Sequence, residues 1–161
     1  MPTSTPPGFN IKIIVQSLSP TQRKYLLFSH SFSGCDTVSA VFGFSKEKLY
    51  GKFSNAGLDD ILDVFYDKNS TVDEITSAGI STFQFIYNGT GTPLSEERLN
   101  RFNKQQSKIG VLRPEGLPPT DGAAAQHSLR AYLQLHDWIK LQSMSRDPTM
   151  YGWYITNSGR Y

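Results

Sequence analysis

A short segment in the first third of the chain carries residues whose types and order could support metal chemistry. Gly34, Cys35 and Asp36 lie between two stretches with helical periodicity. A carboxylate is the kind of ligand that Mg²⁺ and Mn²⁺ prefer, and a turn between helices can present it to solvent. The sequence therefore makes Asp36 a candidate metal ligand and catalytic residue. Aspartate is also a favoured helix N-cap, so a helix starting after Asp36 would give it a structural role instead.

A second glycine turn follows and leads into a run of lysines. Its candidate phosphate-binding residues are Gly43, Ser45, Lys46, Lys48 and Lys52, and Glu47 is the only opposing charge. The exposed amides and the dipole of a helix N-terminus attract anions. Lys48 and Lys52 are four residues apart and would share a helical face. The alternative is a plain turn between two helices with solvated lysines.

Two further groups of residues have both a chemical and a structural interpretation. His127 and Arg130 lie one turn apart on an expected helix and could contact phosphate, although packing is the commoner role for such a pair. The spacing of Asp59, Asp63 and Asp67 places them on one helical face. An acidic face opposite an apolar stripe is typical of a solvated amphipathic helix, and this interpretation is favoured over a second metal site.

Helical spacing of apolar residues and several capping motifs predict a mainly α-helical domain. A capping box at Ser19 and another at Thr71 mark helix starts, and Asn10 and Ser45 are further caps. The first helix has a short strand as its alternative, because it contains a β-branched run. The expected helices cover about 11–18, 20 to about 33, 37–42, 46 to near 57, about 58–65, 72 to about 87, 93 to near 110 and about 123–141, and the tail 151–155 is expected to be extended.

Length and composition favour one intracellular domain. The 161 residues suit a single core, with a loose leader at 1–9, the domain at 10–155 and a tail at 156–161. One cysteine excludes an internal disulfide and fits a reducing compartment. No stretch approaches the roughly 18 apolar residues of a membrane helix, so no membrane partner is expected. A net charge of +2 neither requires nor excludes nucleic acid.

Several separated motifs resemble one protein family. The segment 30–40, His-Ser-Phe-Ser-Gly-Cys-Asp-Thr-Val-Ser-Ala, resembles the signature His-Ala-Phe-Thr-Gly-Cys-Asp-Thr-Thr-Ser-Ala of a large animal family often found near mobile elements. The resemblance continues at 117–120, 126–131, Trp138 and 152–153, and covers roughly residues 10 to 155. The Gly-Cys-Asp segment is in turn similar to flap-endonuclease-like (PIN-like) 5′-nucleases, in which a Gly-x-Asp supplies a late metal-binding carboxylate.

That resemblance implies a fold and a function. The chain would be a multi-helix domain with a helix–turn–helix of the 5′-nuclease C-terminal type and without the nuclease β-sheet core. Asp36 would bind Mg²⁺ or Mn²⁺, and residues 43–48 would grip nucleic acid, with DNA favoured over RNA and a nuclear location over a cytoplasmic one.

The same resemblance implies that the chain is inactive alone. A two-metal site needs several carboxylates, and no acidic residue precedes Asp36. Cleavage would therefore require a missing upstream nuclease segment with an acidic core as partner. A protein-interaction module and a non-functional truncated remnant of a mobile-element gene are the alternatives.

Overall fold

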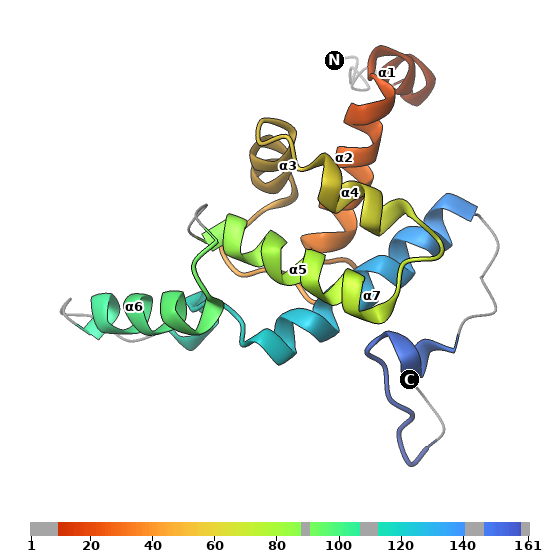
Figure 1. Cartoon of the computed structure of the whole chain (residues 1–161). Coiled ribbons are helices and arrows are strands. Elements are labelled where there is room, and N and C mark those ends of the chain that lie inside the picture. The colour runs from red at the N-terminus through yellow and green to blue at the C-terminus, as the bar shows by residue number, and fades with distance from the viewer. Residues whose placement is uncertain (1–9, 88–90, 107–112, 141–146, 159–161) are drawn as a thin grey trace, which may run out of the picture.

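The chain is mainly helical, as predicted. The computed structural model describes residues 10–87, 91–106, 113–140 and 147–158, and within these ranges it contains no strand (Figure 1). The α-helices are α1 (Ile11–Ser17), α2 (Pro20–Phe32), α3 (Lys46–Ser54), α4 (Asp59–Tyr66), α5 (Val72–Tyr87), α6 (Leu94–Gln106) and α7 (Asp121–Lys140), and the 3₁₀ helices are η1 (Pro114–Gly116) and η2 (Pro148–Tyr151). No helix within these ranges combines the length and hydrophobicity needed to cross a lipid bilayer.

The capping motifs read from the sequence start the helices as expected. Ser19 Oγ accepts a hydrogen bond from the Gln22 amide at 3.1 Å, and Gln22 Oε1 accepts one from the Ser19 amide at 2.8 Å. Thr71 and Glu74 make the same reciprocal pair, at 3.3 and 2.8 Å. The Asn10 side chain accepts from the first turn of α1, which confirms the helix over the alternative strand. Each cap satisfies amides that a helix start leaves unpaired.

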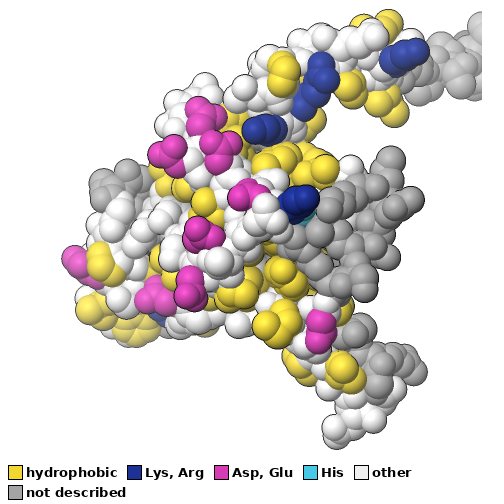
Figure 2. Space-filling view, turned by 45° about the vertical axis from the view of Figure 1, so that its right-hand side comes forward, with side chains coloured by type: hydrophobic (Ala, Val, Ile, Leu, Met, Phe, Trp, Pro, Cys, Tyr) yellow, Lys and Arg dark blue, Asp and Glu magenta, His cyan; other side chains and the backbone are white. Residues whose placement is uncertain are grey.

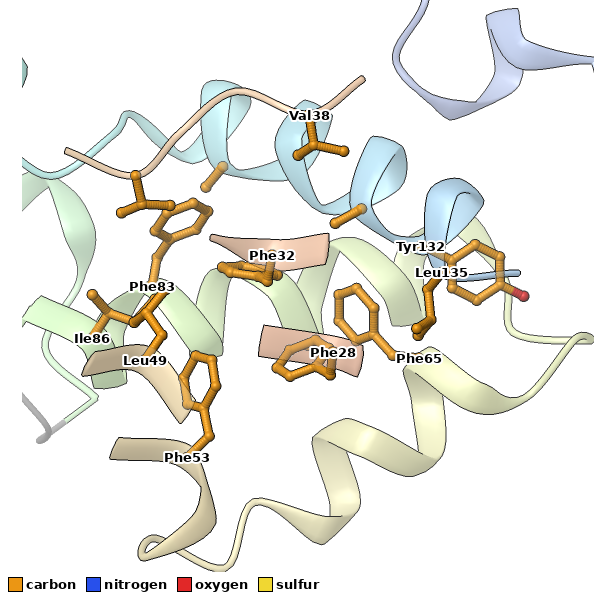
Figure 3. Close-up of a cluster of buried hydrophobic side chains, with 14 of the residues drawn as sticks. Phe28, Phe32, Val38, Leu49, Phe53, Phe65, Phe83, Ile86, Tyr132 and Leu135 are labelled. Carbon is orange, nitrogen blue, oxygen red and sulfur yellow. The ribbon is translucent and has the colours of Figure 1, made fainter. Parts of the chain in front are cut away.

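The core lies between α2, α5 and α7, where α7 packs against both α2 and α5; α3 packs on α2, and α4 packs mainly on α5. Phe28 is at its centre: its ring centroid lies 4.8 Å from Phe65 and 5.3 Å from both Phe32 and Phe53 (Figure 3). All four rings are fully buried. Tilted and edge-on aromatic contacts of this kind add about 0.5–1.5 kcal/mol per pair beyond burial. A single aromatic cluster therefore joins the helices that carry the candidate site.

A glycine allows α5 and α7 to approach closely. An added Cβ at Gly79 would lie 1.7 Å from Ser128 Oγ and 2.2 Å from Ser128 Cβ. Ser128 is fully buried, and its hydroxyl donates to the Ala124 carbonyl at 2.7 Å. The contact between these helices thus depends on the absence of a side chain at Gly79.

The short helix expected over 37–42 is wrong. Residues 33–45 form an irregular loop, so the turn at Gly43 does not join two helices and the expected helix–turn–helix is not formed there. Val38 and Val41 are both buried, and Figure 3 shows Val38 beside α7. The loop buries both side chains without forming a helix, and it is held by local hydrogen bonds such as Cys35 N–H to Val38 O at 2.9 Å. The packing of these valines overrides the local propensity.

The two ends of the described chain differ from the expectation in their packing. The tail expected to be extended over 151–155 instead follows η2 as irregular chain, and Gly152 ends that 3₁₀ helix with φ +81°. At the other end, α1 has no buried residue. Its four β-branched apolar side chains are 42–73% exposed, and α1 projects from the top of the domain (Figures 1 and 2). The apolar stripe that predicted α1 therefore faces solvent.

Candidate site at the Asp36 loop

The backbone of the loop 33–45 is held against itself. Gly34 has φ +107°, and an added Cβ there would lie 2.4 Å from Ala40 Cα. The Val41 amide donates to the Ser33 carbonyl at 3.1 Å, which closes the loop at its base. The buried side chains of Val38 and Val41 attach it to the core. The loop is thus fixed by a close backbone crossing, a hydrogen bond and two apolar contacts.

Lys46 closes the loop from its other end. Its ammonium group donates to the Gly34 carbonyl at 2.5 Å, to the His30 carbonyl at 3.3 Å and to Ser33 Oγ at 3.5 Å. These groups lie at the C-terminus of α2, where carbonyls lack helical partners and a positive charge is favourable. Lys46, predicted to bind phosphate, therefore has a structural role in this structure.

Asp36 lies at the exposed tip of this loop. No helix starts after it, so the N-cap interpretation is wrong. Within the described part of the chain, the Asp36 carboxylate makes no hydrogen bond or ion pair. His30 is the charge-sensitive neighbour: burial and the Lys46 ammonium lower the pKa of His30 below its usual value, and Asp36 acts in the opposite direction. Asp36 is thus available to a ligand from outside.

Asp36 borders a pocket between the loop and α7. The pocket has a volume of about 430 Å³ and includes Trp138, whose ring centroid lies 5.0 Å from that of His30 in a tilted contact. Thr37 Oγ1 donates to the Gln134 side-chain oxygen, which attaches the loop to α7. A smaller pocket of about 200 Å³ adjoins it. Thr37 and Gln134 line both pockets, and the smaller one is also lined by Arg130 and Trp153.

The lysine turn is folded back on the protein. Ser45 caps α3 by accepting from the Lys48 amide at 3.3 Å, as predicted. The Lys48 ammonium donates to the Gly43 carbonyl at 3.2 Å and lies 4.6 Å from the Phe44 ring centroid. Lys52 lies over an aromatic ring of α5 at 5.3 Å. The two ammonium groups are thus held in place on the surface of α3, and a turn that already has its own cap offers fewer free amides to a phosphate.

The two residues singled out on α7 have different surroundings. His127 is buried, its Nε2–H donates to the Phe32 carbonyl at 2.9 Å, and burial lowers its pKa to about 4. This burial argues against the predicted contact with phosphate. Arg130 is half-buried, donates to the Gly152 carbonyl at 2.9 Å and borders the pockets beside the loop. Desolvation lowers the pKa of Arg130 below its usual value.

The acidic residues do not assemble into a metal site in the part of the chain that the structure describes. No three Asp, Glu, His or Cys side chains there lie close enough to hold an ion together. On α4, Asp63 pairs with Lys24 at 3.7 Å and Asp59 accepts from the Tyr25 hydroxyl at 3.2 Å. These contacts agree with the solvated-face interpretation of α4.

Charge is distributed unevenly along the chain. Residues 59–74 contain six acidic residues and one basic residue, a net charge of −5. Because the whole chain carries +2, all other residues together carry +7. Several of the acidic side chains lie on the face that Figure 2 shows. Any surface that meets a polyanion would therefore lie away from α4 and the start of α5.

The sequence did not indicate which aromatic and amide residues complete the site. Gln134 was not singled out, and Trp138 and Trp153 were noted only for the family resemblance. All three line the pockets beside the loop through the packing of α7 and η2. Thr37 and Gln134 are 97 residues apart, and no local pattern indicates such a pair. Comparison of the chain with protein-family models, curated proteins and solved structures found no match.

Proposed function

We propose that this chain is the helical, nucleic-acid-binding portion of a PIN-like metal-dependent nuclease, and that it cleaves only when other carboxylates are supplied. The observation that carries the proposal is the state of Asp36. Its carboxylate is exposed and unpaired within the described residues, and it lies on a loop that is fixed on both sides. A hard cation with further oxygen ligands suits such a carboxylate.

The position of the charges supports nucleic acid as the partner. Lys48 and Lys52 lie on α3 just after the loop, and Arg130 borders the pockets on its other side. The Lys48 ammonium has one carbonyl partner and the Lys52 ammonium lies over a ring, so both keep N–H groups for phosphate. Lys46 is not assigned a phosphate contact, because its ammonium group already donates to three acceptors of the loop and the end of α2, and its loss would disturb the loop that presents Asp36.

Salt-dependent binding tests this proposal. A labelled duplex with a single-stranded flap is titrated with the protein at several salt concentrations, and binding is followed by fluorescence anisotropy. The combined substitutions Lys48→Gln and Lys52→Gln should weaken binding and reduce the slope of log K against log salt by about 2, since each phosphate contact contributes about 0.9. The matched control is Lys12→Gln with Lys24→Gln, which removes the same charge from α1 and α2. Equal losses in the two variants, or salt-independent binding, would contradict the proposal.

The role of Asp36 has a separate test. The purified chain with Mg²⁺ or Mn²⁺ should release no product from flap DNA. In the DNA complex, where phosphate adds oxygen ligands, Mn²⁺ should broaden the NMR amide signals of residues 34–38, and Asp36→Asn should abolish this effect. Broadening that persists in Asp36→Asn would remove Asp36 as a ligand. Cleavage by the chain alone that Asp36→Asn abolishes would show that no further carboxylates are needed.

A second candidate function, a protein-interaction module, is favoured by α1. Ile11 and Ile13 are 73% and 63% exposed, and no residue of α1 is buried. Apolar side chains gathered on a projecting helix are typical of docking surfaces. Replacing both isoleucines by Ser should leave the thermal stability of the domain unchanged and abolish any self-association seen in analytical ultracentrifugation. Unchanged self-association would exclude α1 as the contact.

A further inference from the structure

A pocket beside the same loop, which Asp36 does not line, has the features of a small-molecule site. It has a volume of about 390 Å³ and lies between residues 39–42, η1, the end of α5 and α7. Ligand pockets in proteins usually measure about 300–1,000 Å³. Its walls are mostly apolar and include the aromatic rings of Phe42, Phe83 and Tyr87. Phe42 is 48% exposed, so one of these rings is open to a ligand.

His127 lines this pocket and carries an unpartnered polar atom. The residue is 6% exposed and belongs to the pocket lining. Because the Phe32 carbonyl can only accept, Nε2 must carry the proton in their 2.9 Å hydrogen bond. The ring is neutral at physiological pH, since burial lowers its pKa to about 4. Its other nitrogen, Nδ1, is therefore a hydrogen-bond acceptor, and it has no partner among the described residues.

An unpaired acceptor inside a protein requires an explanation. Buried polar atoms nearly always have a hydrogen-bond partner, because a buried atom without one has lost its hydration with nothing in return. The ring centroids of Phe32 and Phe83 lie 4.9 and 5.1 Å from the His127 centroid in T-shaped contacts, and these two rings offer no strong donor. Nδ1 is the one hydrogen-bonding atom that His127 can still offer the pocket, so its natural partner is a donor placed there.

Two arginines make the pocket favourable for an anion. Arg98 donates to the Pro118 carbonyl at 2.5 Å, and Arg130 donates to the Gly152 carbonyl at 2.9 Å. Each of these hydrogen bonds uses one of the five N–H groups of a guanidinium. Glu115 is the only acidic residue of the lining, so the pocket has a net positive charge. Guanidinium groups are suited to carboxylates, which they can bind through two parallel hydrogen bonds.

We propose that this pocket binds a small aromatic carboxylate that carries an N–H or O–H donor. The ring of the ligand packs on the apolar wall, its donor meets His127 Nδ1, and its carboxylate meets Arg98 and Arg130. The proposal shares Arg130 with the proposed nucleic-acid surface but uses neither Asp36 nor the lysines of α3, so its tests rest on His127 and Arg98, which that surface does not include.

Indole-3-acetate is a suitable probe, because it has the ring, the N–H and the carboxylate. Binding to the full chain is measured by isothermal titration calorimetry and by NMR. Indole lacks the carboxylate and 1-methylindole-3-acetate lacks the donor, so each should bind roughly tenfold more weakly or worse. Equal binding of all three molecules would overturn the proposal, and so would the absence of saturable binding, which would leave water as the occupant.

Two substitutions locate the probe in this pocket. In His127→Leu, both ring nitrogens are lost, so residue 127 offers the pocket no acceptor. This variant should bind indole-3-acetate and its 1-methyl analogue equally. Arg98→Met should weaken the binding of indole-3-acetate and leave the binding of indole unchanged, and Arg23→Met on α2 is the matched control. If His127→Leu does not fold, the comparison of the two ligands on the natural chain still decides the role of Nδ1.

Discussion

Replacing Gly34 by Ala should destabilise the protein strongly, because two separate costs combine at this position. A non-glycine residue with positive φ costs about 1–3 kcal/mol, and Gly34 has φ +107°. The new Cβ would also lie 2.4 Å from Ala40 Cα and 2.8 Å from the Ser39 carbonyl oxygen. Both atoms belong to the backbone and cannot rotate away, so overpacking adds about 1–3 kcal/mol. The expected loss is roughly 2–6 kcal/mol of the free energy of unfolding.

Gly43→Ala is the matched control. Gly43 has φ +78°, but no atom lies within 4 Å of its added Cβ, so only the conformational cost of about 1–2 kcal/mol applies. Both variants are unfolded with urea and followed by far-ultraviolet circular dichroism, with a common slope for the linear extrapolation. The difference between them isolates the close crossing of the loop backbone at Gly34 and Ala40.

Equal losses of stability in the two variants, to within about 0.5 kcal/mol, would contradict a rigid backbone crossing between Gly34 and Ala40. The loop would then be free to move away from the new methyl group, and the position of Asp36 would not be fixed. If Gly34→Ala is instead the more damaging change, NMR amide shifts in the folded fraction should move most over residues 35–42.

Three other perturbations test separate parts of the structure. Gly79→Ala should cost about 1–3 kcal/mol by overpacking, and adding Ser128→Gly should recover part of that loss in a double-mutant cycle, because the clash is with that side chain. Lys46→Met should cost about 1–2 kcal/mol in urea unfolding through the loss of three acceptors at the end of α2, whereas Lys48→Met, with one carbonyl partner, should cost less than half as much. His127 has a pKa of about 4 in the folded protein and an ordinary value near 6.5 in the unfolded chain, so between these pH values the unfolded chain binds the extra proton. The free energy of unfolding should therefore fall by roughly 3 kcal/mol as pH drops from about 7 to 4, and His127→Gln should remove that part of the pH dependence.

The sequence predicted the helices well because their start signals are local. A capping box such as Ser19 with Gln22 depends on residues three apart, and the same residues form it in the structure. The α2 and α4 stripes were predicted on the same basis, and Phe28 and Phe65 are fully buried. By contrast, the first stripe identified α1 as a helix but could not tell whether a partner covers it, since that depends on surfaces outside the segment.

The candidate site was predicted only in part because its geometry depends on long-range packing. The sequence singled out Asp36 but predicted a short helix after it over 37–42, where the structure has a loop whose two valines pack into the core. Lys46 was read as a phosphate ligand, and its contact with the end of α2 depends on how the loop returns. For His127 the sequence left open a contact with phosphate or a packing role, and the structure buries it with one ring nitrogen on a carbonyl of α2. In each case the residue was noticed, and its partner was not.

The uneven charge along the chain has a consequence for how the molecule moves toward a partner. A total of +2 suggests weak electrostatics, yet −5 within residues 59–74 against +7 elsewhere gives the protein an electric dipole moment. In the field of a polyanion, such a molecule experiences a torque as well as an attraction. Rotational alignment before contact raises the fraction of productive collisions, and this effect weakens with salt over the Debye length of about 10 Å at 0.1 M. The acidic helix α4 would then influence the orientation in which the molecule approaches the partner, without contacting that partner itself.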